Sequence, residues 1–183
     1  MSGGKVVSIA VMTAVAGFGV LADRITKVWA LDTLGEVAMD DYSWFGGLLR
    51  LRLAFNTGAA FGMGAGSTVV FSVLSLTAAL LLIIFALWKL RHWWQGALFG
   101  LLLAGIGGNL IDRLTREPGS FRGSVIDFIA VKWFAVFNVA DICITCGALL
   151  LCCWMIIAER RKVGFFSWLP LSVAASDRSE MIP

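Results

Sequence analysis

Two aspartates, Asp127 and Asp141, are the residues of this chain best suited to chemistry. Asp127 lies in the β-branched run 125–129, and Asp141 lies just inside a long apolar segment. A carboxylate at the edge of a membrane is costly, so it usually has a function or a partner. Two carboxyl groups that meet there can share one proton, and such a pair can activate water for peptide hydrolysis.

The composition predicts that these acids belong to an integral membrane protein. Of the 183 residues, 59% are hydrophobic, and the mean hydropathy is +0.86, which exceeds what is usual in soluble domains. A spanning helix needs roughly 17–25 residues. We therefore expect an all-α membrane protein whose single domain, 1–183, contains four transmembrane helices. Their expected ranges are about 6–22, 68–90, 96–111 and 134–158.

The first apolar block has two interpretations. A removable signal peptide would use Lys5 as a short charged region and Val20-Leu21-Ala22 as a loose cleavage site. The apolar run is longer than the roughly 7–15 residues typical of such peptides. This length favours a retained spanning helix.

Charge sets the expected orientation. Lys89, Arg91 and the basic run 160–162 lie next to span ends, where positive charge favours the cytoplasmic side. Both termini are therefore expected in the cytoplasm, with a tail at about 159–183. The net charge is only +3 and no dense basic cluster is present, which argues against nucleic-acid binding.

The outer segments are expected to hold a small β-sheet. Residues 49–55 alternate apolar and polar side chains, which is typical of a strand, and 125–129 form a second short β-branched run. We expect an extracytoplasmic sheet on the membrane surface, built from about 36–65 and 123–132. Asp127 would lie on one strand, with Ile126 and Phe128 facing the other way.

Two polar clusters precede the third span. Asp23 and Lys27 are four residues apart, so on a helix they share a face. They form either a simple interfacial ion pair or part of a site. Asn56 and Gly58 follow the alternating strand, and taken alone they indicate a turn.

Two further clusters end the third span and begin the fourth. Asn109 and Arg113 project from one helix face, and Asp112 borders it. An Arg at a helix end is ordinary, but a buried Asn beside it implies a polar cavity or a partner. Asn138 and Asp141 also share a face, and the helix N-terminus favours the Asp141 anion.

No metal and no cofactor is expected. Cys143 and Cys146 form a C-x-x-C inside an apolar block, far from the only histidine, His92. Cysteine in such a place behaves as a small apolar residue. Gly100, with small residues at four-residue intervals after it, predicts close helix packing.

Five motifs in order make the chain similar to a known family, the bacterial lipoprotein signal peptidases or type II signal peptidases. Arg24 stands where that family commonly has Gln. The motifs are Asp23-x-x-Thr26-Lys27, Asn56-x-Gly58-Ala59-Ala60-Phe61, Gly105-x-Gly107-Gly108-Asn109-x-x-Asp112-Arg113, Val125-x-Asp127-Phe128 and Phe137-Asn138-x-Ala140-Asp141.

The resemblance implies an aspartic endopeptidase of the bacterial cytoplasmic membrane, with its active site at the outer face among the membrane lipids. It would cleave the signal peptide from prolipoproteins just before a Cys that carries diacylglycerol. Asp127 and Asp141 would be the catalytic pair. Supporting or substrate-contacting roles are implied for Asp23, Lys27, Asn56, Gly108, Asn109, Asp112, Arg113, Asn138 and Ala140.

The chemistry of hydrolysis allows a more specific hypothesis. One carboxylate takes a proton from water while the protonated partner polarises the carbonyl. Asn109, Arg113 and Asn138 would orient the substrate backbone or the developing oxyanion. Two other classes stay open: a small proton- or ion-coupled transporter, in which intramembrane acids form a relay, and a purely structural membrane subunit.

Overall fold

The computed structural model describes residues 3–35, 42–58 and 67–160. The helices are α1 (Gly3–Leu34), α2 (Thr68–Lys89), α3 (Trp93–Thr115) and α4 (Val139–Arg160). The strands are β1 (Ser43–Trp44), β2 (Leu49–Asn56) and β3 (Val125–Val131), with a 3-10 turn, η1 (Phe45–Gly47), after β1. The predicted segments 36–41, 59–66 and 161–183 lie outside the described residues.

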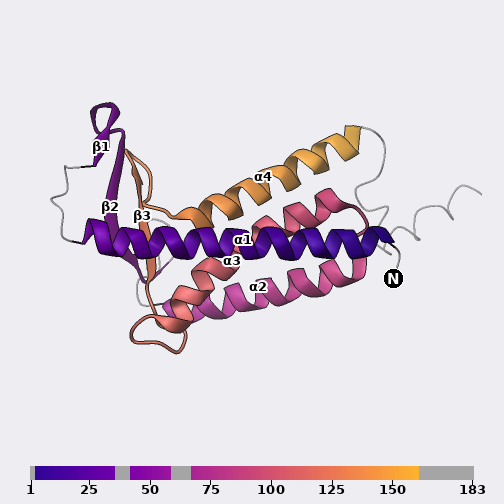
Figure 1. Cartoon of the computed structure of the whole chain (residues 1–183), viewed down its shortest axis with the longest axis horizontal. Helices are drawn as coiled ribbons and strands as arrows, with labels where there is room; N and C mark the ends of the chain where they lie inside the picture. Colours follow the sequence, from indigo (N-terminus) through magenta and orange to yellow (C-terminus); the bar gives the residue numbers. More distant parts are fainter. Residues whose placement is uncertain (1–2, 36–41, 59–66, 161–183) are drawn as a thin grey trace, which may run out of the picture. The chain divides into compact units, whose positions relative to one another are not determined.

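The prediction of four span-length helices is confirmed. All four are long and apolar enough to cross a membrane. The chain divides into two compact units, Met1–Gly147 and Ala148–Pro183. The first unit contains α1, α2, α3, the sheet and the beginning of α4, and it holds every candidate site residue named above (Figure 1).

The first helix differs from its predicted range. Residues 6–22 were expected to span the membrane, yet α1 continues to Leu34. Asp23 and Lys27 do not end the helix, because both side chains are buried inside the protein and paired with each other. A helix of 32 residues is roughly 48 Å long, which exceeds the roughly 30 Å of a hydrocarbon core.

Close packing of α1 against α3 follows from small residues, as predicted. A Cβ added at Gly100 would meet the Met12 carbonyl oxygen at 2.8 Å, so only glycine allows this approach. Met12 of α1 also forms an apolar cluster with Ala86 of α2 and Leu90 just after it, and Phe99 and Leu103 of α3 pack against this cluster. These contacts join α1, α2 and α3 near the C-terminal end of α2. Figure 1 shows the three helices running beside one another.

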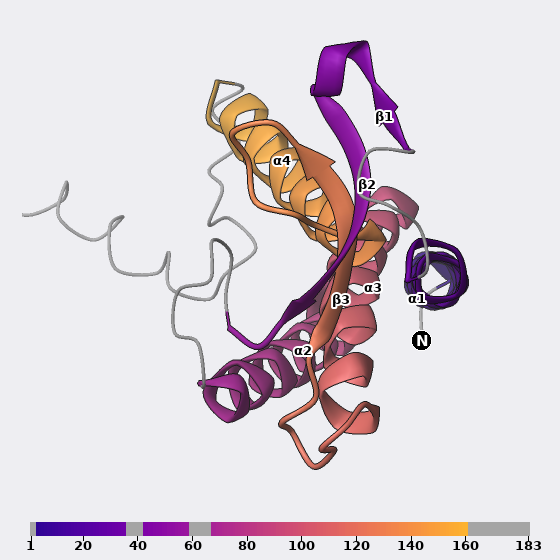
Figure 2. The same ribbon diagram turned by 90° about the vertical axis from the view of Figure 1, so that its left-hand side faces the viewer.

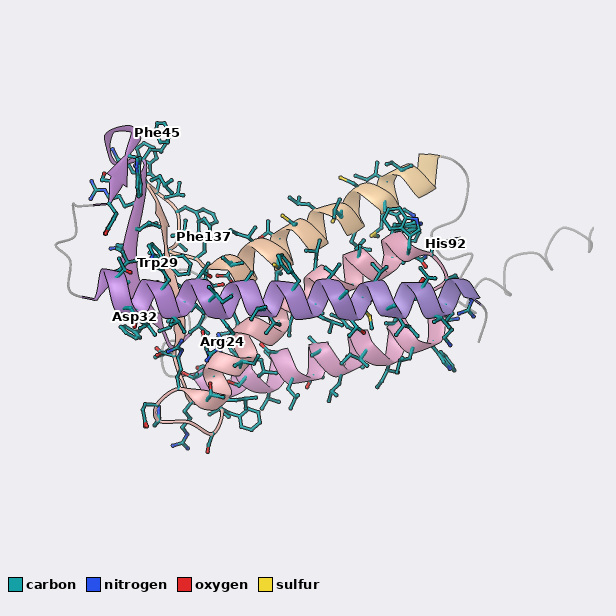
Figure 3. All side chains as sticks on the ribbon, viewed as in Figure 1. Arg24, Trp29, Asp32, Phe45, His92 and Phe137 are labelled. Carbon is teal, nitrogen blue, oxygen red and sulfur yellow. The ribbon has the colours of Figure 1, made fainter. Side chains whose placement is uncertain are left out.

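The predicted sheet is also confirmed, and it has three antiparallel strands in the order β1-β2-β3. Ala54 of β2 lies opposite Asp127 of β3, and the register shifts between Leu51 and Ala54. Figure 2 shows β2 and β3 side by side over much of their length. The sheet lies at the Arg24 end of α1, whereas His92 lies at the other end (Figure 3).

Both faces of β3 are buried around Asp127. Ile126, Asp127 and Phe128 are all buried, at 0%, 3% and 4% exposure. Phe128 packs edge-on against Trp29 of α1 and clusters with Ala30 and Leu34. The strand is therefore covered on both sides, and Asp127 is removed from water.

Candidate active site

The middle of β3 places Asp127. Its two carboxylate oxygens accept hydrogen bonds from two asparagines, Asn56 Nδ2 at 3.0 Å and Asn138 Nδ2 at 2.6 Å. Asn56 also accepts a bond from the backbone N–H of Gly58 at 2.9 Å. The turn predicted at Asn56 and Gly58 thus exists, and the same side chain that forms it also holds the acid.

The start of α4 places Asp141. Its carboxylate accepts the Asn138 backbone N–H at 3.1 Å, while the Asn138 side chain accepts the Asp141 N–H at 3.0 Å. These reciprocal bonds form a capping box, with Asn138 as the N-cap. The span predicted from residue 134 actually begins at Val139. Asp141 therefore lies in the first helical turn, where the helix dipole favours an anion.

A return of the chain brings the two acids together. Phe137 forms an isolated antiparallel bridge with Ile129, with hydrogen bonds of 2.9 and 3.0 Å. Because Phe137 pairs beside β3, the next residue, Asn138, reaches Asp127. The apolar run 134–137 had been assigned to the fourth span, so this bridge was not predicted.

Lys27 organises the centre of the site. Its ammonium group lies 2.8 Å from Asp23 Oδ2, 2.8 Å from Asp112 Oδ2 and 3.0 Å from Asn109 Oδ1. An ammonium has three donors, and each has an acceptor here. The Lys27 side chain is fully buried. The ion pair of Asp23 and Lys27 therefore lies inside the site and is not a simple interfacial ion pair.

Two asparagine amides connect Lys27 to the acids. Asn109 Oδ1 accepts from Lys27 and from Asn138 Nδ2 at 3.1 Å, and Asn109 Nδ2 donates to Asp141 Oδ1 at 2.8 Å. Because an ammonium can only donate, Lys27 requires the Asn109 oxygen to face it, and the amide nitrogen then faces Asp141. The orientation of both amides follows from this one buried cation.

Asp23, Gly108 and Ala140 hold three helices in position. Asp23 Oδ1 accepts the backbone N–H of Ala140 at 2.9 Å, which ties α1 to the first turn of α4. A Cβ on Gly108 would lie 2.6 Å from Asp23 Oδ2 and 3.1 Å from the Ala140 Cβ. Glycine at 108 is therefore required for this contact.

Asp112 joins α3 to β3 and to the neighbouring cations. Its other carboxylate oxygen, Oδ1, accepts from Arg116 at 2.8 Å and from Arg24 at 3.2 Å, and Oδ2 accepts the Ile126 N–H at 3.3 Å. Arg24 stands where the family that this chain resembles commonly has Gln. It adds a second cation, besides Arg116, to the Asp112 carboxylate. The Arg24 side chain is 38% exposed, so the added bond is worth little, about 0–1 kcal/mol.

A cleft of about 250 Å³ opens beside the two acids. Arg113 lines it and donates from a terminal guanidinium nitrogen to the Gly58 carbonyl at 3.0 Å. The Arg113 Nε is buried without a hydrogen-bond partner among the described residues. The cleft is lined by Asn56, Gly58, Asn109, Arg113, Val125, Asp127, Phe134, Ala135, Val136, Phe137, Asp141, Ile144 and Thr145.

Some supporting contacts were not anticipated from the sequence. Thr68 at the start of α2 donates to the Thr57 carbonyl at 2.6 Å, and Ser72 one turn later donates to the Phe121 carbonyl at 2.8 Å. The first bond holds the turn that carries Gly58, and the second holds the loop that leads into β3. A hydroxyl at the beginning of a spanning helix is too common to have indicated this.

Burial changes the acidity of Asp127. Removal from water raises its pKa from 3.8 to about 6, and the nearby charge of Asp141 adds to the rise, while the bonds from Asn56 and Asn138 oppose it. A carboxyl group of this kind retains its proton in mildly acidic conditions. It can therefore donate a hydrogen bond, as acids in hydrolytic carboxyl pairs do.

Four span-length helices and two carboxyl groups beside one cleft are features expected of an aspartic-type membrane peptidase. The profile of one family, Signal peptidase (SPase) II, matches residues 15–157. The chain belongs to this family, and it is therefore a multi-pass membrane peptidase of bacteria.

Relatives and solved structures agree with this assignment. A lipoprotein signal peptidase of Streptomyces coelicolor is 43% identical over 145 residues, covering 78% of this chain and 69% of that one. One of Rhodococcus jostii is 38% identical over 138 residues, covering 75% and 68%. A solved bacterial membrane enzyme matches with a TM-score of 0.72 and 26% identity, covering 84% of this chain and 92% of that chain.

Proposed function

We propose that this protein removes the signal peptide from prolipoproteins by cutting just before a diacylglyceryl-modified Cys, with Asp127 and Asp141 as the catalytic pair. One observation carries the proposal. An acid from β3 and an acid from α4 are linked by the same two asparagines, Asn109 and Asn138, beside one cleft. The substrate class follows from the lipoprotein signal peptidases that the chain is similar to.

The environments of the two acids suggest different roles. Asp127 is 3% exposed with a pKa raised to about 6, so it holds the shared proton and polarises the scissile carbonyl. Asp141 accepts two hydrogen bonds at a helix N-terminus, which stabilises the anion. It takes a proton from water, and the oxygen attacks the carbonyl carbon. The leaving nitrogen then receives a proton from the pair as the C–N bond breaks.

The three proposed substrate-orienting residues separate into two groups. Asn138 is fully buried and donates both amide hydrogens, to Asn109 and to Asp127. It has no hydrogen for a substrate, so we assign it to positioning the acids. Arg113 lines the cleft, and its Nε–H has no partner among the residues that the structure describes. Asn109 lines the cleft as well. These two are the candidates to bind the substrate backbone or the oxyanion.

The surroundings of the pair suit a substrate that lies partly in the membrane. The apolar side chains of Phe137 and Ile144 line the cleft where α4 begins, and an apolar signal peptide fits there.

We infer that the sheet end of the protein lies at the outer face, that both termini are cytoplasmic and that residues 1–183 act as one domain. A cysteine placed at exposed Ser43 should react with an impermeant thiol reagent from outside intact cells if this orientation is right.

The test is cleavage of a purified diacylglyceryl-modified precursor by the protein in detergent. The wild type should release the signal peptide, whereas Asp127→Asn and Asp141→Asn should release none while eluting as folded protein. Arg122→Gln, an exposed change in the loop before β3, is the control and should be active. Cleavage by either Asn variant would refute the acid pair, and equal cleavage of the unmodified precursor would refute the lipid requirement.

A further inference from the structure

Two hollows continue from the catalytic cleft along β3. The nearer, of about 330 Å³, shares Asp127, Asn56 and Phe134 with the cleft and is also lined by Arg52, which the cleft does not include. The second, of about 490 Å³, shares Arg52 and Phe134 with it. Together they form a path that begins at a catalytic acid. We call the part lined by Arg50, Arg52, Lys132, Trp133 and Phe134 the basic groove.

Two cations of the basic groove, Arg50 and Lys132, lie against specific neighbours. Arg50 and Arg52 are exposed residues two positions apart on β2. A Cβ on Gly47 would meet the Arg50 guanidinium at 2.8 Å, so the glycine, at φ +83°, lets that group lie across it. The Lys132 ammonium lies 4.7 Å from the centre of the Trp133 ring, a favourable cation–π contact.

The path changes polarity along its length. Apolar side chains line the cleft beside α4, whereas three cations line the basic groove. Among the described residues that line the two hollows, Asp127 is the only acid. An apolar signal peptide fits the α4 side. The polar chain on the other side of the cleaved bond fits the groove.

On the basis of the proposed function, we propose that the basic groove binds the first residues of the substrate after the cleaved bond and favours acidic side chains there. Ala130 of β3 pairs with Arg50 and lies three positions from Asp127, roughly 10 Å at the rise of a strand. An extended substrate covers that distance in about three residues. The preference should therefore concern the first four or so residues of the mature lipoprotein.

An anionic phospholipid headgroup is the other ligand that three cations could bind. The continuity of the path favours the polypeptide, because the nearer hollow opens directly on Asp127 and also contains Arg52. A chain leaving the acid pair in that direction must pass the Arg52 guanidinium. A headgroup has no such connection to the site of cleavage.

The test compares three diacylglyceryl-modified precursors that differ only at mature positions two to five, with acidic, neutral or basic side chains. Cleavage is measured as kcat/KM in uncharged detergent and in bilayers with and without anionic lipid. The variants are Arg52→Gln alone and combined with Arg50→Gln and Lys132→Gln. Arg122→Gln removes one charge from an exposed loop residue outside the path and is the matched control.

The wild type and the control should cleave the acidic precursor faster than the basic one, by about two- to five-fold for each exposed ion pair formed. Salt should weaken the preference. It should fall in Arg52→Gln and disappear in the triple variant. Equal rates for the acidic and basic precursors in the wild type, or a preference that survives Arg52→Gln unchanged, would overturn the inference.

Two other results have separate meanings. If anionic lipid changes the wild-type rate for all three precursors equally and the cation variants abolish that effect, the groove binds headgroups and the inference is wrong. If the wild type cleaves none of the precursors, the proposed function itself fails. Cleavage of the neutral precursor without any charge preference rejects only the groove.

Discussion

Replacing Asp127 with Asn should change how the stability of the protein depends on pH. In the wild type, folding raises the pKa of this carboxyl from 3.8 to about 6, chiefly through burial. A raised pKa means that the folded state holds the proton more tightly than the unfolded state. The stability that this provides is fully present below about pH 3.8 and is lost as the pH rises through about 6.

The size of the effect follows from the same values. A rise from 3.8 to about 6 is worth roughly 3 kcal/mol, since each pH unit corresponds to about 1.36 kcal/mol. Most of it, about 2–3 kcal/mol, should appear between about pH 4 and about pH 8. The Asn variant cannot ionise, so its stability relative to the wild type should increase by that amount over this range.

Comparing the variant with the wild type at two pH values isolates the contribution of Asp127 ionisation to stability. In the Asn variant, the new side-chain NH2 group faces the NH2 group of Asn56 or Asn138, so one hydrogen bond is lost. This loss costs about 1–3 kcal/mol at every pH. Measuring Tm of both proteins in one detergent at about pH 4 and about pH 8 cancels that cost. The Tm gap should move in favour of the variant by roughly 4–12 °C.

The control is Ser72→Ala, which removes a fully buried hydroxyl that does not titrate. Its Tm gap should be the same at both pH values. The stability of the Asp141→Asn variant should depend less on pH than that of the wild type, because the charge of Asp141 is the second cause of the raised pKa of Asp127. If the gap between Asp127→Asn and the wild type does not change with pH, the reasoning from burial is refuted.

Four other outcomes are expected. The kcat/KM for cleavage should fall as the pH rises above about 6, where Asp127 loses its proton; a rate that only rises through this range would exclude Asp127 as the acid. Lys27→Met should lower stability by about 3–5 kcal/mol in thermal unfolding, because buried carboxylates lose their cation; a wild-type Tm would contradict this. Gly108→Ala should lower Tm and activity, because its Cβ would clash with the Asp23 carboxylate. Gly107→Ala is the matched control: its Cβ would meet only a methyl group of Val20 at 3.4 Å, so Tm should stay the same or rise. Asn138→Ser should retain the helix cap, and hence the circular dichroism of the wild type, but lose cleavage, because both amide bonds disappear.

The sequence predicted the four helices, and its errors at the ends of the first and third spans have a common cause. The spans were ended where charged residues appear, at Asp23 after the first and at Asp112 in the third. In the structure α1 continues to Leu34 and α3 to Thr115. Asp23 and Asp112 are buried and paired with Lys27. Charges that neutralise one another inside a protein do not mark the membrane boundary, and only their tertiary partners reveal this.

The start of the fourth span could have been predicted better. The run 134–137 is apolar, and its hydrophobicity alone placed it in the helix, but Asn138 and Asp141 have the spacing of a capping box. That pattern places the helix start at Val139. The bridge between Phe137 and Ile129 had no local signal, because it depends on where β3 lies.

The capping box has a consequence for how activity is acquired. Asp141 is both a proposed catalytic group and part of the cap of its own helix, and its partner Asn109 is oriented by Lys27 from the first helix. On the proposed mechanism, a nascent chain lacks a working site until α4 has been inserted and its first turn has folded. The same mechanism links hydrolysis to the insertion of α4, so that an enzyme inserted only up to α3 would not cleave nearby proteins.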